Sequence, residues 1–289
     1  MKTIILSIFL LSFSTNVFSQ KKVVKQFGHA IELYDSKIYD SSFIIFQQIY
    51  RKGRGDLSLI SKAYYNMGYI LLITKDYANA KMIFEDILTS DFDDMDEGGT
   101  GEGLMAEPYA LYKNNSCNIL AKLALEEKDF KKALAYTEMA DKEYPYYHFC
   151  GNEYAANNIH LAWLYAKCYE GLGDKDKALT TLLPECLDNG LANNDSIVKM
   201  AAQLIKEKYK YEEIEAAIDN AVAGISSRKV RIGTNSRTQY ITSLFQFEMT
   251  LPGSYYYGSD YRKAKDLDEL GRYTYNFRNS TFIAALLNN

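Results

Sequence analysis

Cysteine is scarce in this 289-residue chain, which has four: Cys117, Cys150, Cys168 and Cys186. Four cysteines over this length do not make a disulfide scaffold, and helical packing can bury a cysteine as a small hydrophobic side chain. An oxidising compartment would permit a disulfide, so a single bridge stays open. The composition favours free thiols.

Other absences exclude classes of function. There is no basic excess, since 33 Lys and Arg stand against 37 Asp and Glu, so nothing indicates nucleic-acid binding. The glycines between residues 98 and 103 are followed by no Gly-Lys-Ser/Thr and preceded by no strand, so they do not form a phosphate loop. No apolar run after the N-terminus approaches the roughly 18 residues of a membrane helix. We therefore expect no enzyme, no cofactor and no membrane span.

The first residues are organised like a secretory signal. Lys2 precedes the apolar run 4–11, which is too short to span a bilayer, and a small residue stands at the expected cleavage point between Ser19 and Gln20. A lipoprotein signal would need a cysteine just after the cut, and there is none. An uncleaved anchor is the alternative. We expect cleavage of residues 1–19 and a soluble periplasmic or secreted protein, a monomer or weak dimer.

A twelve-residue step between small residues recurs along the chain. An aromatic residue often stands three positions before the second member, as Tyr77 and Phe130 do, and a bulky residue often stands four positions after it, as Phe84 does. Two helices that meet at small residues and fill their grooves with bulky ones would give this pattern. The five steps join Ala30 to Ser42, Gly68 to Ala80, Ala121 to Ala133, Ala166 to Ala178, and Ala202 to Ile214.

This pattern resembles the tetratricopeptide repeat over residues 23–224, most closely in the second, third and fourth units. The resemblance implies a mainly α fold, a solenoid of about five helix pairs, in which each pair buries its apolar face against the next. We expect residues 20–224 to form this repeat domain and residues 225–289 to form a small C-terminal α+β cap.

The excess length between units falls in two links, at residues 90–107 and 144–154. Because the step inside each unit is constant, we expect both links to emerge as neighbours along one edge of the solenoid, here called the link edge. The first link is acidic. Its residues from Asp94 onward fail the calcium-loop pattern, because Met105 occupies the closing acidic position. A solvated or disordered acidic loop is therefore favoured over a calcium site.

The C-terminal part changes character. Residues 228–232 lead to turn residues at 233–236, and residues 239–250 alternate as a strand does. We place Ile241, Phe245, Phe247 and Met249 on one face. Residues 260–271 suggest a short polar helix, and residues 273–287 a further strand or a last helix. The sheet would cover the final repeat.

Two surfaces are candidate binding sites. The resemblance implies that the first helix of each unit lines a concave groove, and aromatics, amides and lysines there suit a peptide or a partner loop. The aromatic second link either binds a partner or seals a gap between units. His148, Cys150, Glu153 and His160 form a weak candidate for a metal or nucleophilic centre. The predicted partner-binding residues are Tyr65, Tyr69, Asn115, Asn118, Lys122, His160, Trp163 and Lys167 in the groove, and Tyr146, Tyr147 and His148 on the second link.

The predicted function is non-catalytic binding of a protein or peptide outside the cytoplasm, by a preformed groove and the link edge. Two narrower roles are compatible with the same features. One is a periplasmic immunity protein that neutralises a secreted toxin. The other is an accessory protein for glycan uptake, with Trp and Tyr as platforms for sugars.

Overall fold

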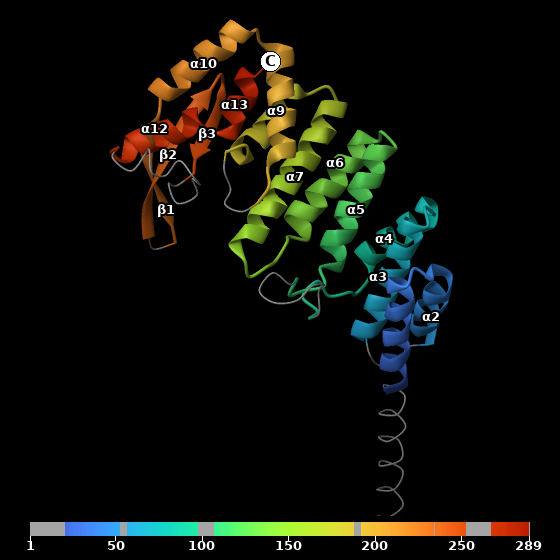
Figure 1. The fold of residues 1–289 in the computed structure, drawn as a ribbon. Coiled ribbons are helices and arrows are strands. Elements are labelled where there is room, and N and C mark those ends of the chain that lie inside the picture. The colour runs from blue at the N-terminus through green and yellow to red at the C-terminus, as the bar shows by residue number, and fades with distance from the viewer. Residues whose placement is uncertain are drawn as a thin grey trace, which may run out of the picture.

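The computed structural model describes residues 21–52, 57–97, 107–187, 192–233, 235–252 and 267–288. The expected signal segment, residues 1–19, lies outside these ranges. Helices dominate, and they follow one another as a succession of packed rods (Figure 1). After a helix over residues 21–35 come α2 (Tyr39–Lys52), α3 (Leu57–Ile73), α4 (Tyr77–Thr89), α5 (Tyr112–Glu126), α6 (Phe130–Glu138) with the π turn η2 (Met139–Glu143), α7 (Gly151–Gly171), α8 (Lys175–Leu182) with the 3-10 turn η3 (Leu183–Glu185), α9 (Asp195–Lys208) and α10 (Tyr211–Ala223).

The small residues of the twelve-residue step are the contact points of the helix pairs. All ten are buried. In the first pair the Ser42 hydroxyl donates to the Ala30 carbonyl at 2.8 Å. In the second pair a Cβ built on Gly68 would lie 2.8 Å from the Phe84 ring. A larger side chain at position 68 would therefore push a fully buried ring out of place.

The turn inside each of the first four pairs has one conformation. The residue five positions before the second small residue has a positive φ, with values of 61° at Lys37, 63° at Lys75, 59° at Lys128 and 81° at Gly173. In the second, third and fourth pairs an aspartate then caps the next helix, and its carboxylate accepts the backbone N–H three residues on. The left-handed residue reverses the chain, and the cap satisfies an N–H group that the new helix leaves unpaired.

The fifth pair is opened. Its turn residue Tyr209 has an extended conformation, and α9 packs mainly against α13 (Thr281–Leu287) instead of α10. α13 lies between α9 and α10 (Figure 1). Lys206 of α9 donates to the carbonyl of Asn288 at the end of the described chain. The last repeat is thus completed by a helix from the far end of the sequence, and the solenoid class is confirmed.

The C-terminal sheet has three antiparallel strands in the order β1 (Ser226–Ile232), β2 (Asn235–Leu244) and β3 (Phe247–Leu251). Segment 239–250 is therefore a hairpin, because Phe245 takes a left-handed φ of 54° and turns the chain. The prediction that Ile241 shares a face with Phe247 and Met249 is wrong. Tyr240, Thr242 and Leu244 of β2 point inward together with Phe247 and Met249 of β3. Thr242 donates to the Ala221 carbonyl of α10, which fixes the sheet on the last repeat.

The C-terminal segment described at residues 267–288 is mostly helical. α12 (Glu269–Arg278) and α13 resolve the open choice over residues 273–287 in favour of helix. The polar helix predicted at residues 260–271 overlaps only the start of α12, and residues 260–266 lie outside the described ranges. A helix and the sheet together cover the last repeat, as an array requires for its terminal apolar face.

The two long links are neighbours, as predicted. The Tyr146 hydroxyl donates to the Glu107 carboxylate at 3.0 Å. The rings of Tyr109 and Phe149 meet edge to face with centroids 5.7 Å apart. The Tyr144 hydroxyl donates to the Leu88 carbonyl. These contacts join one link to the other and to the end of α4.

The first link is not simply a solvated loop where it is described. The backbone carbonyls of Asp96 and Asp94 accept hydrogen bonds from the N–H groups of Ala110 and Leu111, respectively. The carboxylate of Asp94 accepts the N–H groups of Lys113 at 2.6 Å and Asn114 at 3.1 Å. Asp94 therefore caps α5 from a distant position. Leu111 occupies the N-cap position of α5, and its apolar side chain makes no capping hydrogen bond. The prediction missed this because the carboxylate and the N–H groups are about 20 positions apart.

The four cysteines are free. Cys117, Cys168 and Cys186 are fully buried, and burial raises the pKa of the Cys117 thiol to about 12 and of the Cys168 thiol to about 11. These side chains pack as small apolar groups.

Candidate functional site: a groove between α5 and α7

The first helices of the third and fourth units, α5 and α7, contact each other, and α6 packs against both. Two cavities follow the groove between them. Both are open to the surface, and the side chain of Lys122 lines both. The two cavities thus adjoin at Lys122 along neighbouring first helices.

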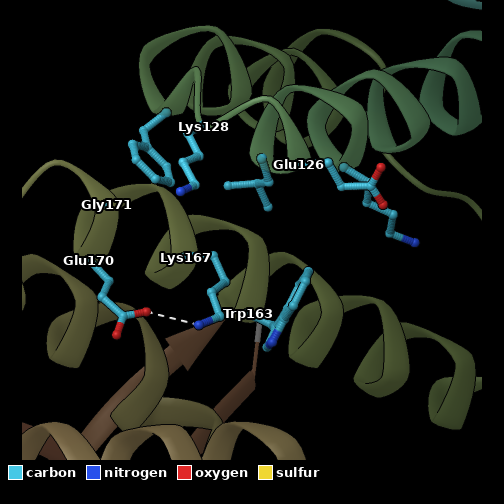
Figure 2. Close-up of a pocket in the computed structure, with 9 residues that line it drawn as sticks. Glu126, Lys128, Trp163, Lys167, Glu170 and Gly171 are labelled. Atoms are coloured by element: carbon cyan, nitrogen blue, oxygen red, sulfur yellow. Dashed lines mark hydrogen bonds and ion pairs between the residues drawn. The ribbon is translucent and has the colours of Figure 1, made fainter. Parts of the chain in front are cut away.

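The first cavity is mostly apolar and has a volume of about 570 Å³. Figure 2 shows the α5 side of the cavity carrying Lys128 and Glu126, opposite Trp163 and Lys167 of α7. The Lys167 ammonium pairs with Glu170 at 2.9 Å, which holds this charge against its own helix. The lining residues are Lys122, Leu125, Glu126, Lys128, Phe130, Trp163, Lys167, Glu170 and Gly171.

The shape of the first cavity depends on Gly171. A Cβ at this position would lie 2.2 Å from the Phe130 ring. Glycine therefore allows the ring at the start of α6 to lie against the end of α7 and to form one wall. Phe130 is one of the aromatic residues that precede the second small residue of a unit by three positions, so the repeat pattern supplies this wall.

The second cavity is more polar than the first and has a volume of about 310 Å³. Three helices and the second link surround it. The Tyr146 hydroxyl is held there by its hydrogen bond to Glu107 of the first link. The lining residues are Tyr69, Asn114, Asn115, Asn118, Ile119, Lys122, Tyr146, Glu153, Ala156, Asn157 and His160.

A buried amide pair forms the floor of the second cavity. The Asn118 side-chain N–H group donates to both oxygens of Asn114 at 3.1 Å. Asn114 in turn donates to the carbonyls of Ala140 at 3.0 Å and Tyr144 at 2.6 Å. The side-chain oxygen of Asn118 is buried and has no partner among the described residues. An unpaired buried acceptor is costly, and a donor on a bound molecule would satisfy it.

Lys122 is the charged residue that both cavities share. Desolvation, with a smaller contribution from the charge of the nearby Lys122, lowers the pKa of His160 to about 4. The imidazole is therefore neutral at pH 7. Desolvation also lowers the pKa of Lys122. The Lys122 side chain is nevertheless exposed, and an anionic partner close to it would favour the charged ammonium.

Trp163 joins the two halves of the hydrophobic core. Its side chain packs against the cluster of the first three units and against the cluster of the last units and the cap. The His160 ring stacks on it at a centroid distance of 6.4 Å. Trp163 is half-buried, so it serves as a structural bridge and as a wall of the first cavity.

Most of the predicted binding residues meet in this groove. Tyr69, Asn115, Asn118, Lys122, Tyr146 and His160 line the second cavity, while Lys122, Trp163 and Lys167 line the first.

Three predicted residues line neither cavity. Tyr65 packs edge to face on Tyr69, Phe84 and Tyr112, and burial raises its pKa well above the usual value. Tyr147 is 43% exposed. His148 is buried, and its Nδ1 accepts the backbone N–H of Cys150 at 2.9 Å.

The weak candidate for a metal or nucleophilic centre is not assembled. Glu153 and His160 line the second cavity. His148 and Cys150 line neither cavity, and the backbone N–H of Cys150 donates to the His148 ring within the link. Across the described ranges, no three His, Cys, Asp or Glu side chains are grouped so that they could hold a metal ion. Within those ranges no helix is long and apolar enough to cross a membrane.

The lining residues that the sequence prediction missed include Asn114, Asn157, Phe130 and Gly171. Asn114 and Asn118 are four residues apart, and the same interval separates Asn118 from Lys122. This i, i+4 row on one helix face is the signal that would have found Asn114. Gly171 left no such signal, because its role depends on a ring in another unit.

The fold and the groove define an α-helical repeat scaffold with a preformed concave site. Residues 61–94 match the family model of the tetratricopeptide repeat. The chain therefore contains a tetratricopeptide repeat, at the unit whose spacing is most regular. No curated protein and no solved structure shows a significant match to the chain. Repeats of this family generally mediate protein–protein interaction.

Proposed function

We propose that the α5–α7 groove binds an extended segment of a partner protein. The observation that carries the proposal is the pair of adjoining cavities that share Lys122. An extended chain presents side chains and backbone amides alternately along its length, and the groove offers an apolar cavity beside a polar one in the same order. A preformed groove binds with little loss of conformational freedom.

Each cavity suits a different part of such a segment. The first cavity, between Trp163 and Phe130, fits a bulky apolar side chain. The second cavity fits backbone N–H and C=O groups, since the unpaired Asn118 oxygen accepts a hydrogen bond and Lys122 donates one. No catalytic step is part of the proposal, because binding alone accounts for the arrangement.

We also propose that the protein works outside the cytoplasm. The support is the organisation of residues 1–19, with a charged start, a short apolar run and a small residue at the expected cleavage point. Fractionation of cells that express the full chain tests this, because mass spectrometry of the exported protein would find Gln20 at its N-terminus. The immunity and glycan-uptake roles stay predictions.

A peptide selection tests the groove. A phage-displayed library of random peptides is selected against the immobilised full chain, and the enriched peptide is synthesised and titrated by calorimetry. We expect Lys122→Glu to weaken binding by about tenfold, because one favourable charge contact is lost and a repulsive one gained. Trp163 is a poor choice for substitution, since its loss would disturb both core clusters.

The matched control is Lys142→Glu, which makes the same charge change at an exposed lysine that lines neither cavity. It should leave affinity within about twofold of the original protein. If the selection enriches no peptide, or if the enriched peptide binds Lys122→Glu as tightly as the control, the proposed function is wrong.

A further inference from the structure

The C-terminal sheet has a free edge at β1. The strand order is β1, β2, β3, so among the described residues β1 has a hydrogen-bonded neighbour only on its β2 side. An edge strand exposes unpaired N–H and C=O groups, which can pair with another chain. This edge belongs to the cap and is separate from the α5–α7 groove.

The edge extends beyond the body of the protein. β3 pairs with residues 240–244 of β2, whereas β1 pairs with residues 235–241. The hairpin tip, residues 228–233 and 235–239, is therefore a two-stranded ribbon that projects past the third strand (Figure 1). Within it no described side chain is buried. Such a ribbon is marginal in water unless a further strand or a packed face supports it.

The ribbon is positively charged although the chain carries a net charge of −4. β1 contains Arg228, Lys229 and Arg231, β2 adds Arg237, and neither strand contains an acidic residue. Arg228 pairs with Glu248 at 3.0 Å. Lys229 and Arg231 instead donate to neutral oxygens, of the Thr238 hydroxyl and the Gly233 carbonyl. Two cations at the free edge thus have no acidic partner in the described ranges.

The register shows which backbone groups face outward. Ile232 pairs with Asn235 across a two-residue connection, and in such a hairpin these flanking residues bond to each other. Because hydrogen-bonded pairs alternate with non-bonded ones along an antiparallel ladder, the N–H and C=O groups of Ser227, Lys229 and Arg231 point away from β2. Cationic side chains and free backbone groups therefore coincide at the same positions.

We propose that the β1 edge accepts an acidic, extended segment of another protein as a fourth strand. The backbone ladder would supply register, and the two cations without an acidic partner, Lys229 and Arg231, would select for acidic side chains. A second copy of this chain is disfavoured as the occupant, because antiparallel pairing of β1 with β1 about Lys229 sets like charges opposite each other. Strand addition would also support the two-stranded ribbon.

Titration of the full chain with a short blocked peptide that alternates glutamate and valine tests the proposal. Backbone NMR signals of β1 should shift, and those of α5 and α7 should not. A peptide that alternates lysine and valine serves as the probe of reversed charge and should not bind. Affinity for the acidic peptide should fall as salt concentration rises.

Two substitutions at one position separate strand addition from simple charge attraction. Both variants remove the cation and its side-chain hydrogen bond to Thr238, and Lys229→Pro also removes the outward N–H without breaking a backbone hydrogen bond to β2. We expect Lys229→Pro to bind about tenfold more weakly than Lys229→Ala, since a ladder hydrogen bond is lost. Circular dichroism should show both variants folded.

Three outcomes would overturn the proposal. The first is equal affinity of Lys229→Ala and Lys229→Pro for the acidic peptide, which would mean that charge attraction alone accounts for binding. The second is tighter binding of a short single-stranded or duplex DNA than of the acidic peptide, which would make the ribbon a nucleic-acid contact. The third is absence of any shift in β1 at millimolar peptide.

Discussion

Asp94 is expected to stabilise α5 from the first link, and replacing it tests the long-range cap. Its carboxylate accepts the N–H groups of Lys113 at 2.6 Å and Asn114 at 3.1 Å. Both groups belong to the first turn of α5, where no intrahelical acceptor is available. Asp94→Ala removes the acceptor and leaves both N–H groups without it.

The size of the effect follows from opposing contributions. Loss of a helix cap costs about 1 kcal/mol and at most about 2 kcal/mol of the free energy of unfolding. The substitution also relieves the desolvation of the carboxylate, which raises the pKa of Asp94 against the two backbone hydrogen bonds. We therefore expect Asp94→Ala to cost about 1 kcal/mol. Asp94→Asn keeps one acceptor oxygen and should cost about half as much.

Urea unfolding followed by circular dichroism measures the loss, and amide hydrogen exchange locates it. Exchange at Lys113 and Asn114 should accelerate in Asp94→Ala. The control is Asp93→Ala, because among the described residues the Asp93 carboxylate accepts only the N–H of Met95 within its own exposed turn. This substitution should change stability by less than about 0.5 kcal/mol. If both alanine variants unfold at the same urea concentration as the original protein, the cap does not exist.

Two further predictions concern buried titratable groups. The pKa of His160 should be about 4 by NMR titration and should rise in Lys122→Met. The His160 imidazole takes up a proton near its ordinary pKa of 6.5 in the unfolded chain, but only near pH 4 in the native protein. The native state should therefore lose stability as the pH falls from about 6.5 to about 4. A measured pKa of 6.5 for His160 would refute the desolvation. In native protein a thiol reagent should modify Cys150 alone, since the other three cysteines are buried. All four should react in urea, and rapid native modification of Cys117 would contradict the packing.

The spacing of small residues predicted the repeat architecture correctly because it is a local property. Each step lies within one helix pair, so residues twelve apart, such as Gly68 and Ala80, report a single contact between adjacent helices. All ten step residues are buried. The spacing did not predict the separation of α9 and α10 in the fifth pair. α13, which packs beside α9, is far away in sequence, so no local pattern indicates its position.

The groove was predicted in outline for the same reason. Positions on the first helix of a unit follow from helical periodicity, so Asn118, Lys122 and Trp163 were correctly placed on the α5 and α7 surfaces that meet. Tyr65 was misplaced, because whether an aromatic ring turns toward the groove or into the core depends on its neighbours Phe84 and Tyr112 in other helices.

The amino-acid sequence by itself determined the paired helices, the emergence of both long links along one edge and the general position of the concave surface, since each of these depends on contacts between residues close together in the chain. Tertiary structure alone decided the capping of α5 by Asp94, the insertion of α13 beside α9 and the union of two cavities at Lys122. Those features join segments that the chain keeps far apart, and only packing in three dimensions selects which distant groups meet.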